Sequence, residues 1–275
     1  TTHVQRAIQE MITDMRFPIY QVDAFTTQLF GGNPAAVMPL QSWLDDASLQ
    51  SIAMENNVSE TAYLVAKGSG YELRWFTPTV EVDLCGHATL AAAHVLWQHL
   101  DCSDAEITFF SRGGELRVLR GDDGLTLNFP AAVLEAVNVP VAVCDILGAV
   151  ASEAMQVSGG PLLLVYEFEE DVARLAPDFG KLQQASPAPV IACAPGDECD
   201  FVSRFFAPQV GIDEDPVTGS AHCALVPYWA GRLGQSRLRA RQISQRGGDL
   251  LCELQEGRVC MTGHAVTFLV GEVML

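Results

Sequence analysis

Two stretches of the chain, about 130 residues apart, repeat nearly the same sequence. The first reads RWFTP at 74–78 and EVDLCGHATLAAAHVLW at 81–97, and the second reads RFFAP at 204–208 and EDPVTGSAHCALVPYW at 214–229. Each copy begins as an aromatic strand and continues through a turn and a glycine into an apolar run of helical spacing. Two copies predict two similar lobes, because a stacked repeat array needs at least about three.

The register of this repeat can be read residue by residue. Arg74 corresponds to Arg204, and a short insertion in the second copy then brings Gly86 into correspondence with Gly219. Each of these glycines directly precedes the apolar helical run. We therefore expect two equivalent glycine–helix starts that face each other across one cleft.

The rest of the chain fits an α+β fold of two pseudo-symmetric lobes, each a curved mixed or antiparallel sheet around a central helix. The central helices are predicted at 87–100 and 220–233, and they should be buried because they are apolar on all sides. The first lobe is assigned to residues 16–133 and the second to 134–264. Residues 265–275 form a last strand that could cross back to the first lobe.

The other elements are assigned from hydrophobic period and turn signals. Further helices are predicted at 45–56 and 171–184, and residues 1–15 resemble a helical extension outside the lobes. Pro227 lies inside the second central helix and predicts a kink there. Strands are predicted at 17–25, 60–67, 71–76, 162–168, 189–194 and 200–206.

The charge balance argues against two classes of partner. The 275 residues include 34 acidic and 16 basic side chains, giving a formal net charge of −18. Such a surface repels nucleic acid and anionic membranes, so neither is expected to bind. No apolar run reaches about 18 residues, so no transmembrane helix is expected.

The eight cysteines are scattered, without C-x-x-C or zinc-finger spacing, and no H-E-x-x-H occurs, so no metal site is expected. Scattered cysteines without a signal peptide are typical of reduced thiols in a cytoplasmic protein. Dinucleotide-binding, P-loop and pyridoxal-phosphate signatures are also missing, so no cofactor is expected. Cofactor-free acid–base chemistry is the interpretation that remains.

The two glycine–helix starts are candidates for binding an anion. A helix N-terminus presents free backbone N–H groups and a partial positive charge, and glycine lets a ligand approach closely. Gly86 and Gly219 would thus hold a small carboxylate substrate on a chain that is otherwise acidic. A purely structural role remains the alternative for either glycine taken alone.

Glu60 is the candidate for moving a proton. It stands in NNVSETAYLV, at the entry of an otherwise apolar strand. A carboxylate in a partly dry cleft can act as general base and acid. The alternative is a solvated surface glutamate, which is the usual place for this residue type.

Four further residues surround the helix starts in the sequence. His87 and Asp215 could complete a proton relay or bind the substrate, and Ser220 occupies the place equivalent to His87. Helix capping is the alternative for His87 and Ser220, and a turn before a proline is the alternative for Asp215. Cys85 is a possible thiol base, with a small buried apolar residue as the alternative.

At these residues the chain resembles the PhzF family, named for phenazine biosynthesis. The resemblance is carried, in order, by VDAFTTQLFGGNPAAV at 22–37, NNVSETAYLV at 56–65, RWFTPTVEVDLCGHATLAAA at 74–93 and RFFAPQVGIDEDPVTGSAHCAL at 204–225. It implies a fold like that of diaminopimelate epimerase, with the active site between two lobes. It also implies cofactor-independent isomerisation by proton transfer, in a homodimer.

The resemblance carries functional residues onto this sequence. It places the family's catalytic glutamate on Glu60, and its other site residues on His87, Asp215, Ser220, Gly86 and Gly219. Two departures stand out. Ala88 occupies a position where the phenazine enzyme has proline. The related epimerases use two opposed cysteines, whereas here Cys85 fills the first position and Asp215 or Thr218 the second, which does not support a two-thiol mechanism.

The sequence therefore predicts an isomerase that acts on a small carboxylate, with Glu60 as its acid–base group. A racemase or epimerase, with bases on both faces of one carbon, is the nearest alternative. A non-catalytic protein that binds a carboxylate or a protein partner is the alternative from another class.

Overall fold

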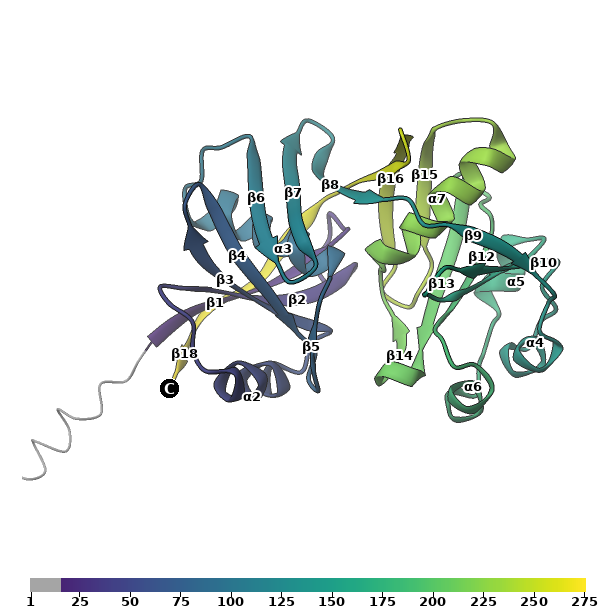
Figure 1. The fold of residues 1–275 in the computed structure, drawn as a ribbon, viewed down its shortest axis with the longest axis horizontal. Coiled ribbons are helices and arrows are strands. Elements are labelled where there is room, and N and C mark those ends of the chain that lie inside the picture. Colours follow the sequence, from purple (N-terminus) through teal and green to yellow (C-terminus); the bar gives the residue numbers. More distant parts are fainter. Residues whose placement is uncertain (1–15) are drawn as a thin grey trace, which may run out of the picture.

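The computed structural model describes residues 16–275, and the helical extension expected at 1–15 lies outside the described residues. The chain forms two halves that lie side by side, the first coloured purple to blue and the second mainly green (Figure 1). Each half is a mixed sheet with a long helix against it, which confirms the predicted α+β class. No helix within 16–275 is both long and apolar enough to cross a membrane.

The first half forms a sheet from residues 16–130. In this sheet β2 with β3 and β4 with β6 are parallel neighbours, and the other neighbours are antiparallel. The strands are β1 (Arg16–Ala24), β2 (Asn33–Leu40), β3 (Glu60–Lys67), β4 (Gly70–Phe76), β5 (Glu81–Val82), β6 (Glu106–Ser111), β7 (Gly114–Gly121) and β8 (Gly124–Pro130).

The second half repeats the same pairings in the same order. Here β11 with β12 and β13 with β15 are the parallel neighbours. The strands are β10 (Glu153–Val157), β11 (Leu162–Val165), β12 (Val190–Pro195), β13 (Phe201–Ala207), β14 (Ile212–Asp215), β15 (Arg237–Gln242), β16 (Gly248–Gln255) and β17 (Arg258–Gly263). The duplication that is visible in the sequence thus extends to the topology of the sheet.

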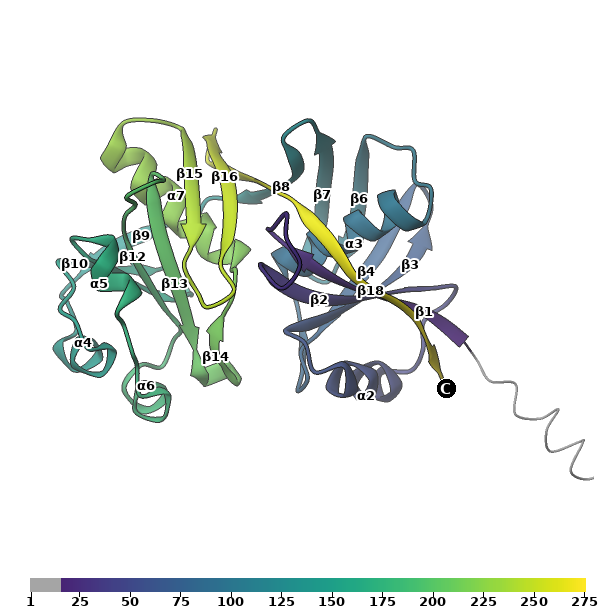
Figure 2. The ribbon, with the colours of Figure 1, turned by 180° about the vertical axis from the view of Figure 1, so that it is seen from behind.

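The two halves exchange their outer strands. After β8 the chain crosses over and forms β9 (Leu134–Val137), which pairs antiparallel with β10 of the second half. After β17 it crosses back as β18 (Ala265–Met274), which pairs antiparallel with β1 of the first half (Figure 2). An antiparallel pair of β8 and β17 also joins the halves directly.

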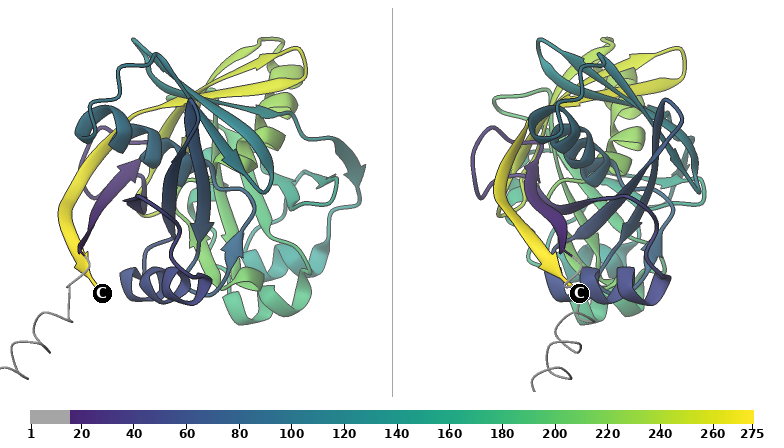
Figure 3. Two further views of the ribbon diagram at one scale, coloured as in Figure 1. Left: turned by 60° about the vertical axis from the view of Figure 1, so that its left-hand side comes forward. Right: turned by 90° about the vertical axis from the view of Figure 1, so that its left-hand side faces the viewer.

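The two long helices are α3 (Gly86–His99) and α7 (Gly219–Leu233), close to the predicted 87–100 and 220–233. Most of their residues are buried, as their uniformly apolar sequences predict, and one hydrophobic core includes both helices. Figure 3 shows α3 with strands of the first half around it. Because this helix is enclosed by its own sheet, its first residues have fixed positions.

The shorter helices differ in part from the prediction. The helix expected at 45–56 is α2 (Asp46–Asn56). The single helix expected at 171–184 is wrong: the chain forms α5 (Glu169–Ala173) and α6 (Phe179–Ala185) instead. Pro177 interrupts the run, because proline lacks the N–H that a helix interior needs. The short helix α4 (Val141–Leu147) was not predicted.

Candidate active site

The helices α3 and α7 begin against each other. A Cβ atom added to Gly86 would lie 3.4 Å from the Cα of Gly219, and one added to Gly219 would lie 3.5 Å from the Cα of Gly86. Those are van der Waals distances, so a side chain at either position would fill the space between the two helix starts. The expected juxtaposition of the two glycine–helix starts is therefore present in the structure.

Neither helix start is capped by a side chain. The N-cap residues are Cys85 and Thr218, and neither makes a side-chain hydrogen bond to the first turn of its helix. The interpretation of His87 and Ser220 as N-caps is therefore wrong. The first N–H groups of both helices, and the positive ends of both helix dipoles, are left for other partners.

Glu60 and His87 are in close contact beside these helix starts. Glu60 is the first residue of β3, and its burial at 9% exposure excludes the alternative of a solvated surface glutamate. Its Oε2 atom lies 3.0 Å from Nε2 of His87, which is 4% exposed. The approach is not an aligned hydrogen bond, and Oε2 has no hydrogen-bond partner among residues 16–275. A buried carboxylate oxygen is thus left free to accept a proton.

Cys85 lies on the other side of the same imidazole. Its Sγ is 3.5 Å from Nδ1 of His87 and 4.0 Å from Nε2. Burial, reinforced by the charge of Glu60, raises the pKa of the Cys85 thiol to about 11. At neutral pH this residue is therefore a thiol, which makes it a poor base.

Asp215, the last residue of β14, lies at the same place although it comes from the second half. Its Oδ1 accepts a hydrogen bond of 2.7 Å from Asn33, and its Oδ2 accepts one from the Thr218 hydroxyl. Burial raises the pKa of Asp215 to about 6, with a further upward contribution from Glu60 and opposing ones from His87, Thr218 and Asn33. The carboxyl can therefore hold or release a proton near neutral pH.

Asn33 links the two halves, and it was not among the residues selected from the sequence. It begins β2 and is fully buried. Its Nδ2 lies 2.7 Å from Asp215 Oδ1, 2.9 Å from the Val217 carbonyl oxygen and 3.1 Å from His87 Nδ1. The pattern FGGNP identified Asn33 only as a turn residue, and no local signal indicates contacts with residues about 180 positions away.

Gln242 is a second buried polar residue that the sequence did not indicate. It ends β15, accepts a 2.8 Å hydrogen bond from the backbone N–H of Thr218, and donates one of 2.6 Å to the Asp215 carbonyl oxygen. These two bonds fix the backbone of the segment that leads into α7. The position of Asp215 therefore depends on a side chain from β15, a strand that pairs with β13 rather than with β14.

Two polar residues of α7 differ in their surroundings. Ser220 is exposed and makes no side-chain hydrogen bond within the described part of the chain. His222 is buried, its Nδ1 lies 2.8 Å from the Thr218 carbonyl oxygen, and burial lowers its pKa to about 4. His222 is therefore neutral at ordinary pH and holds the helix start, whereas Ser220 faces outward.

The charge state of His87 depends on its neighbours. Burial lowers the pKa of His87, whereas negative charge on Cys85 and Glu60 raises it, and with both charges present the pKa lies well above its ordinary value. Because Cys85 is a thiol at neutral pH, it does not supply such a charge there. His87 and Glu60 thus lie in contact as a histidine–carboxylate pair.

The donor atoms of Glu60, Cys85 and His87 lie within 4.8 Å of one another, a spacing that a metal ion could accept. A histidine that binds a metal through one nitrogen donates the N–H of the other to an acceptor. Here Nδ1 of His87 faces the amide nitrogen of Asn33, which is itself a donor. The arrangement around His87 fits a proton better than a metal ion.

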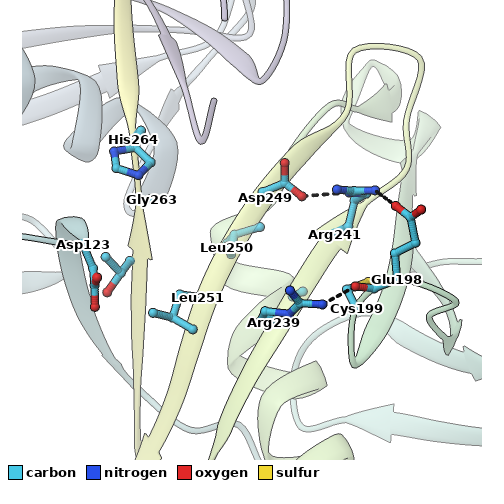
Figure 4. A pocket seen from close by; sticks show the side chains of 12 residues that line it. Asp123, Glu198, Cys199, Arg239, Arg241, Asp249, Leu250, Leu251, Gly263 and His264 are labelled. Atoms are coloured by element: carbon cyan, nitrogen blue, oxygen red, sulfur yellow. Dashed lines mark hydrogen bonds and ion pairs between the residues drawn. The ribbon is translucent and has the colours of Figure 1, made fainter. Parts of the chain in front are cut away.

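A separate cavity of about 360 Å³ is lined by β15, β16 and β17 (Figure 4). Its arginines already have partners: Arg241 donates to Asp249 at 2.8 Å, and Arg239 donates to the carbonyl oxygen of Glu198. None of the clustered residues described above lines this cavity. The candidate active site is therefore the cluster at the two helix starts.

The fold is shared with solved proteins. A solved hydroxyproline epimerase from Agrobacterium vitis has the same fold, with a TM-score of 0.62, 12% identity, and coverage of 94% of this chain and 93% of that chain. The chain belongs to the phenazine biosynthesis-like family, whose sequence pattern matches residues 22–271.

Two closer relatives agree with this assignment. The crystal structure of a PhzF family protein of Enterococcus faecalis has a TM-score of 0.92 and a sequence 46% identical to this chain. The match covers 95% of this chain and 100% of that chain. An uncharacterized isomerase of Pseudomonas aeruginosa is 49% identical over 261 residues, which cover 95% of this chain and all of the relative. The chain is an isomerase of this family.

Proposed function

We propose that the chain is a cofactor-independent isomerase that moves a carbon-bound proton on a small carboxylate, with Glu60 as the acid–base group. One observation carries the proposal. A buried carboxylate oxygen without a hydrogen-bond partner lies in one cluster with two uncapped helix starts. The helix starts would bind the substrate's anion, and the free oxygen would accept its proton.

Substrate binding would use the backbone at Gly86 and Gly219. The N–H groups of both helix starts would donate to the carboxylate, whose charge both helix dipoles favour. Ser220, at the second position of α7, would add a hydroxyl on the outer side. Preorganised donors of this kind also stabilise the enolate-like charge that develops when the neighbouring carbon loses its proton.

Proton transfer would then use Glu60. Its carboxylate would take the proton from carbon, the C–H electron pair would move into the adjacent π system, and the same carboxyl would return the proton to another carbon. His87, 3.0 Å away, would orient this carboxyl and share its proton. A positioned acid–base group typically contributes ~10²–10⁴-fold to the rate.

Epimerisation is a second candidate, because Asp215 supplies another acid from the opposite half. Its pKa of about 6 lets it release or take up a proton near neutral pH. If Glu60 and Asp215 act on opposite faces of one carbon, the product is the epimer of the substrate. If Glu60 acts alone, the proton moves between two carbons.

Solvent deuterium incorporation, followed by NMR, tests the proposal. Cyclic and acyclic amino and hydroxy acids would be incubated with the wild type, with Glu60→Gln, and with Glu55→Gln as a matched control at an exposed glutamate of α2. We expect label in one compound with the wild type and the control, and a loss of ~10²–10⁴-fold in Glu60→Gln. Full turnover in Glu60→Gln would refute the assignment of the base.

The position of the label separates the two reactions. Deuterium on a new carbon indicates isomerisation, and deuterium on the original carbon with inverted configuration indicates epimerisation. Tight binding of a carboxylate without exchange of any proton would instead favour a binding protein.

A further inference from the structure

We infer that Asn33 is a positioning residue that keeps the proton of His87 on Nε2, facing Glu60, and that the second half of the chain sets the orientation of Asn33. The importance of this arrangement rests on the proposed function, because it concerns the proposed proton-transfer pair. Its geometry can be tested without a substrate.

The orientation of the Asn33 amide is determined by a backbone carbonyl. One amide atom lies 2.9 Å from the oxygen of Val217, which can only accept a hydrogen bond. That amide atom must therefore be Nδ2, the donor. The Asp215 Oδ1 atom, 2.7 Å away, favours the same orientation, but the Val217 carbonyl imposes it whether or not Asp215 is ionised.

This orientation has a consequence for the imidazole. Nδ2 of Asn33 also lies 3.1 Å from Nδ1 of His87, and it can only donate. Nδ1 must therefore be unprotonated, and the hydrogen of the neutral ring must be on Nε2. The two hydrogens of the amide serve three acceptors, so one hydrogen is shared between two of them.

The same contact disfavours the charged ring. A proton on Nδ1 would point at the N–H groups of Asn33, with only Cys85 Sγ at 3.5 Å as another neighbour. The groups that face His87 are Glu60, Cys85 and Asn33, with Asp215 behind Asn33. Of these, Glu60 favours a charged ring, whereas burial and Asn33 oppose it. The neutral ring with the proton on Nε2 fits the contact with Asn33 and places its N–H towards Glu60.

The position of the proton on His87 depends on both halves of the chain. Asn33, His87 and Glu60 belong to the first half, whereas the acceptors that orient Asn33, Val217 and Asp215, belong to the second. The second half thus determines which nitrogen of His87 carries a proton, although it does not touch that proton. A hydrogen on Nε2 would face Glu60 and any substrate bound next to it.

The direct test is ¹⁵N NMR of the substrate-free protein labelled at histidine nitrogens. The His87 signals are assigned by their loss in His87→Gln. At neutral pH we expect the pattern of a neutral ring protonated on Nε2. A ring protonated on Nδ1, or on both nitrogens, would overturn the inference whatever the enzyme's activity.

Two variants test the role of Asn33. Asn33→Asp replaces the donor by an acceptor of the same shape, so His87 should gain a proton on Nδ1. Asn33→Leu removes the contact, so the ring should populate both neutral forms. Asn128→Asp makes the same change of side chain at a residue that accepts from Arg258 and makes no hydrogen bond to the site residues, and it should leave the His87 pattern unchanged.

Activity gives the second readout. With an identified substrate, both Asn33 variants should turn over more slowly than the wild type. They should lose part of the ~10²–10⁴-fold rate acceleration that a positioned acid–base group provides, mainly as a lower kcat rather than a changed KM. An unchanged His87 pattern in both variants would make Asn33 merely structural. Failure to find any isomerised substrate would count against the proposed function and leave the NMR result intact.

Discussion

The two halves of the molecule have the same scaffold but differ at the helix starts. In the first half Arg74 donates to Glu81 through Nε and Nη2 at 2.7 and 2.8 Å, and in the second half Arg204 donates to Glu214 at the same two distances. Each guanidinium also lies over a phenylalanine two residues further on, at 5.1 and 4.9 Å. A strand-to-turn clamp has thus been kept in both copies.

The residues around the helix starts have diverged. By the repeat, Thr218 is the counterpart of Cys85 and Ser220 is the counterpart of His87. The strand registers make Pro189 the counterpart of Glu60. The helix starts that would bind the carboxylate are therefore duplicated, whereas the neighbouring carboxylate and imidazole of Glu60 and His87 occur once. This comparison favours one acid–base group acting on a symmetrically held anion.

Equivalent substitutions at the two helix starts test this asymmetry most strongly. His87→Gln should lower kcat/KM by ~10²–10⁴-fold, because it removes half of the histidine–carboxylate pair. Ser220→Ala should have a much smaller effect, because the Ser220 side chain is exposed. Steady-state kinetics checks both, and equal losses would show that both helix starts take part in the proton chemistry.

The two glycines should respond alike. Gly86→Ala and Gly219→Ala each add a Cβ at van der Waals distance from the opposite helix start, so both proteins should fold with little loss of stability. Each should nevertheless lose on the order of 10²-fold in activity, because the methyl group occupies the space of the bound anion. Thermal unfolding and kcat/KM are the measurements, and a loss in only one variant would place the carboxylate on one helix.

The two arginine–glutamate pairs, Arg74 with Glu81 and Arg204 with Glu214, should differ in how much they stabilise the fold. Arg204→Met should lower the free energy of unfolding by about 3–5 kcal/mol. It leaves the Glu214 carboxylate without its ion-pair partner and removes a 2.7 Å hydrogen bond to the Leu175 carbonyl oxygen. Arg74→Met should cost less, because Glu81 keeps a 2.7 Å contact with Arg112.

Denaturant unfolding measures the cost of each clamp. The double variant Arg204→Met, Glu214→Leu provides the control, and it should recover part of the loss because no buried charge is left unpaired. Equal losses of unfolding free energy in Arg74→Met and Arg204→Met would contradict the prediction that the second pair stabilises the fold more than the first.

Asp215 should make stability depend on pH. Its pKa rises on folding from 3.8 to about 6, so between these values the folded state binds more protons and stability falls as pH increases. Asp215→Asn removes this dependence and should be more stable than the wild type at pH 7 by roughly 3 kcal/mol, a difference that disappears below pH 4. Unfolding by urea across this range checks the sign, and a wild type that gains stability over the window would contradict it.

Much of the fold could be predicted because the repeat consists of local sequence patterns. The central helices and the helix at 45–56 follow from hydrophobic spacing, and the family follows from the motifs around Gly86 and Gly219. The roles of the site residues stay predictions. The wrong helix at 171–184 came from giving spacing more weight than Pro177.

The contacts that complete the site could not be predicted in this way. Asn33 lies in a Gly-Gly-Asn-Pro sequence that indicates a turn, and Gln242 lies in an ordinary strand. Their partners, Asp215 and Thr218, are brought to them by the docking of whole sheets. Such contacts cannot be predicted from local sequence, because they form only in the tertiary structure.

The exchange of outer strands bears on how the protein is made. During synthesis residues 16–130 are made before residues 265–274, which form the strand that covers β1. The first half therefore keeps an open sheet edge while the second is translated, at a stage when exposed edges invite association with other chains. Only the returning strand closes that edge, so the first half cannot reach its final form before the second half has been made.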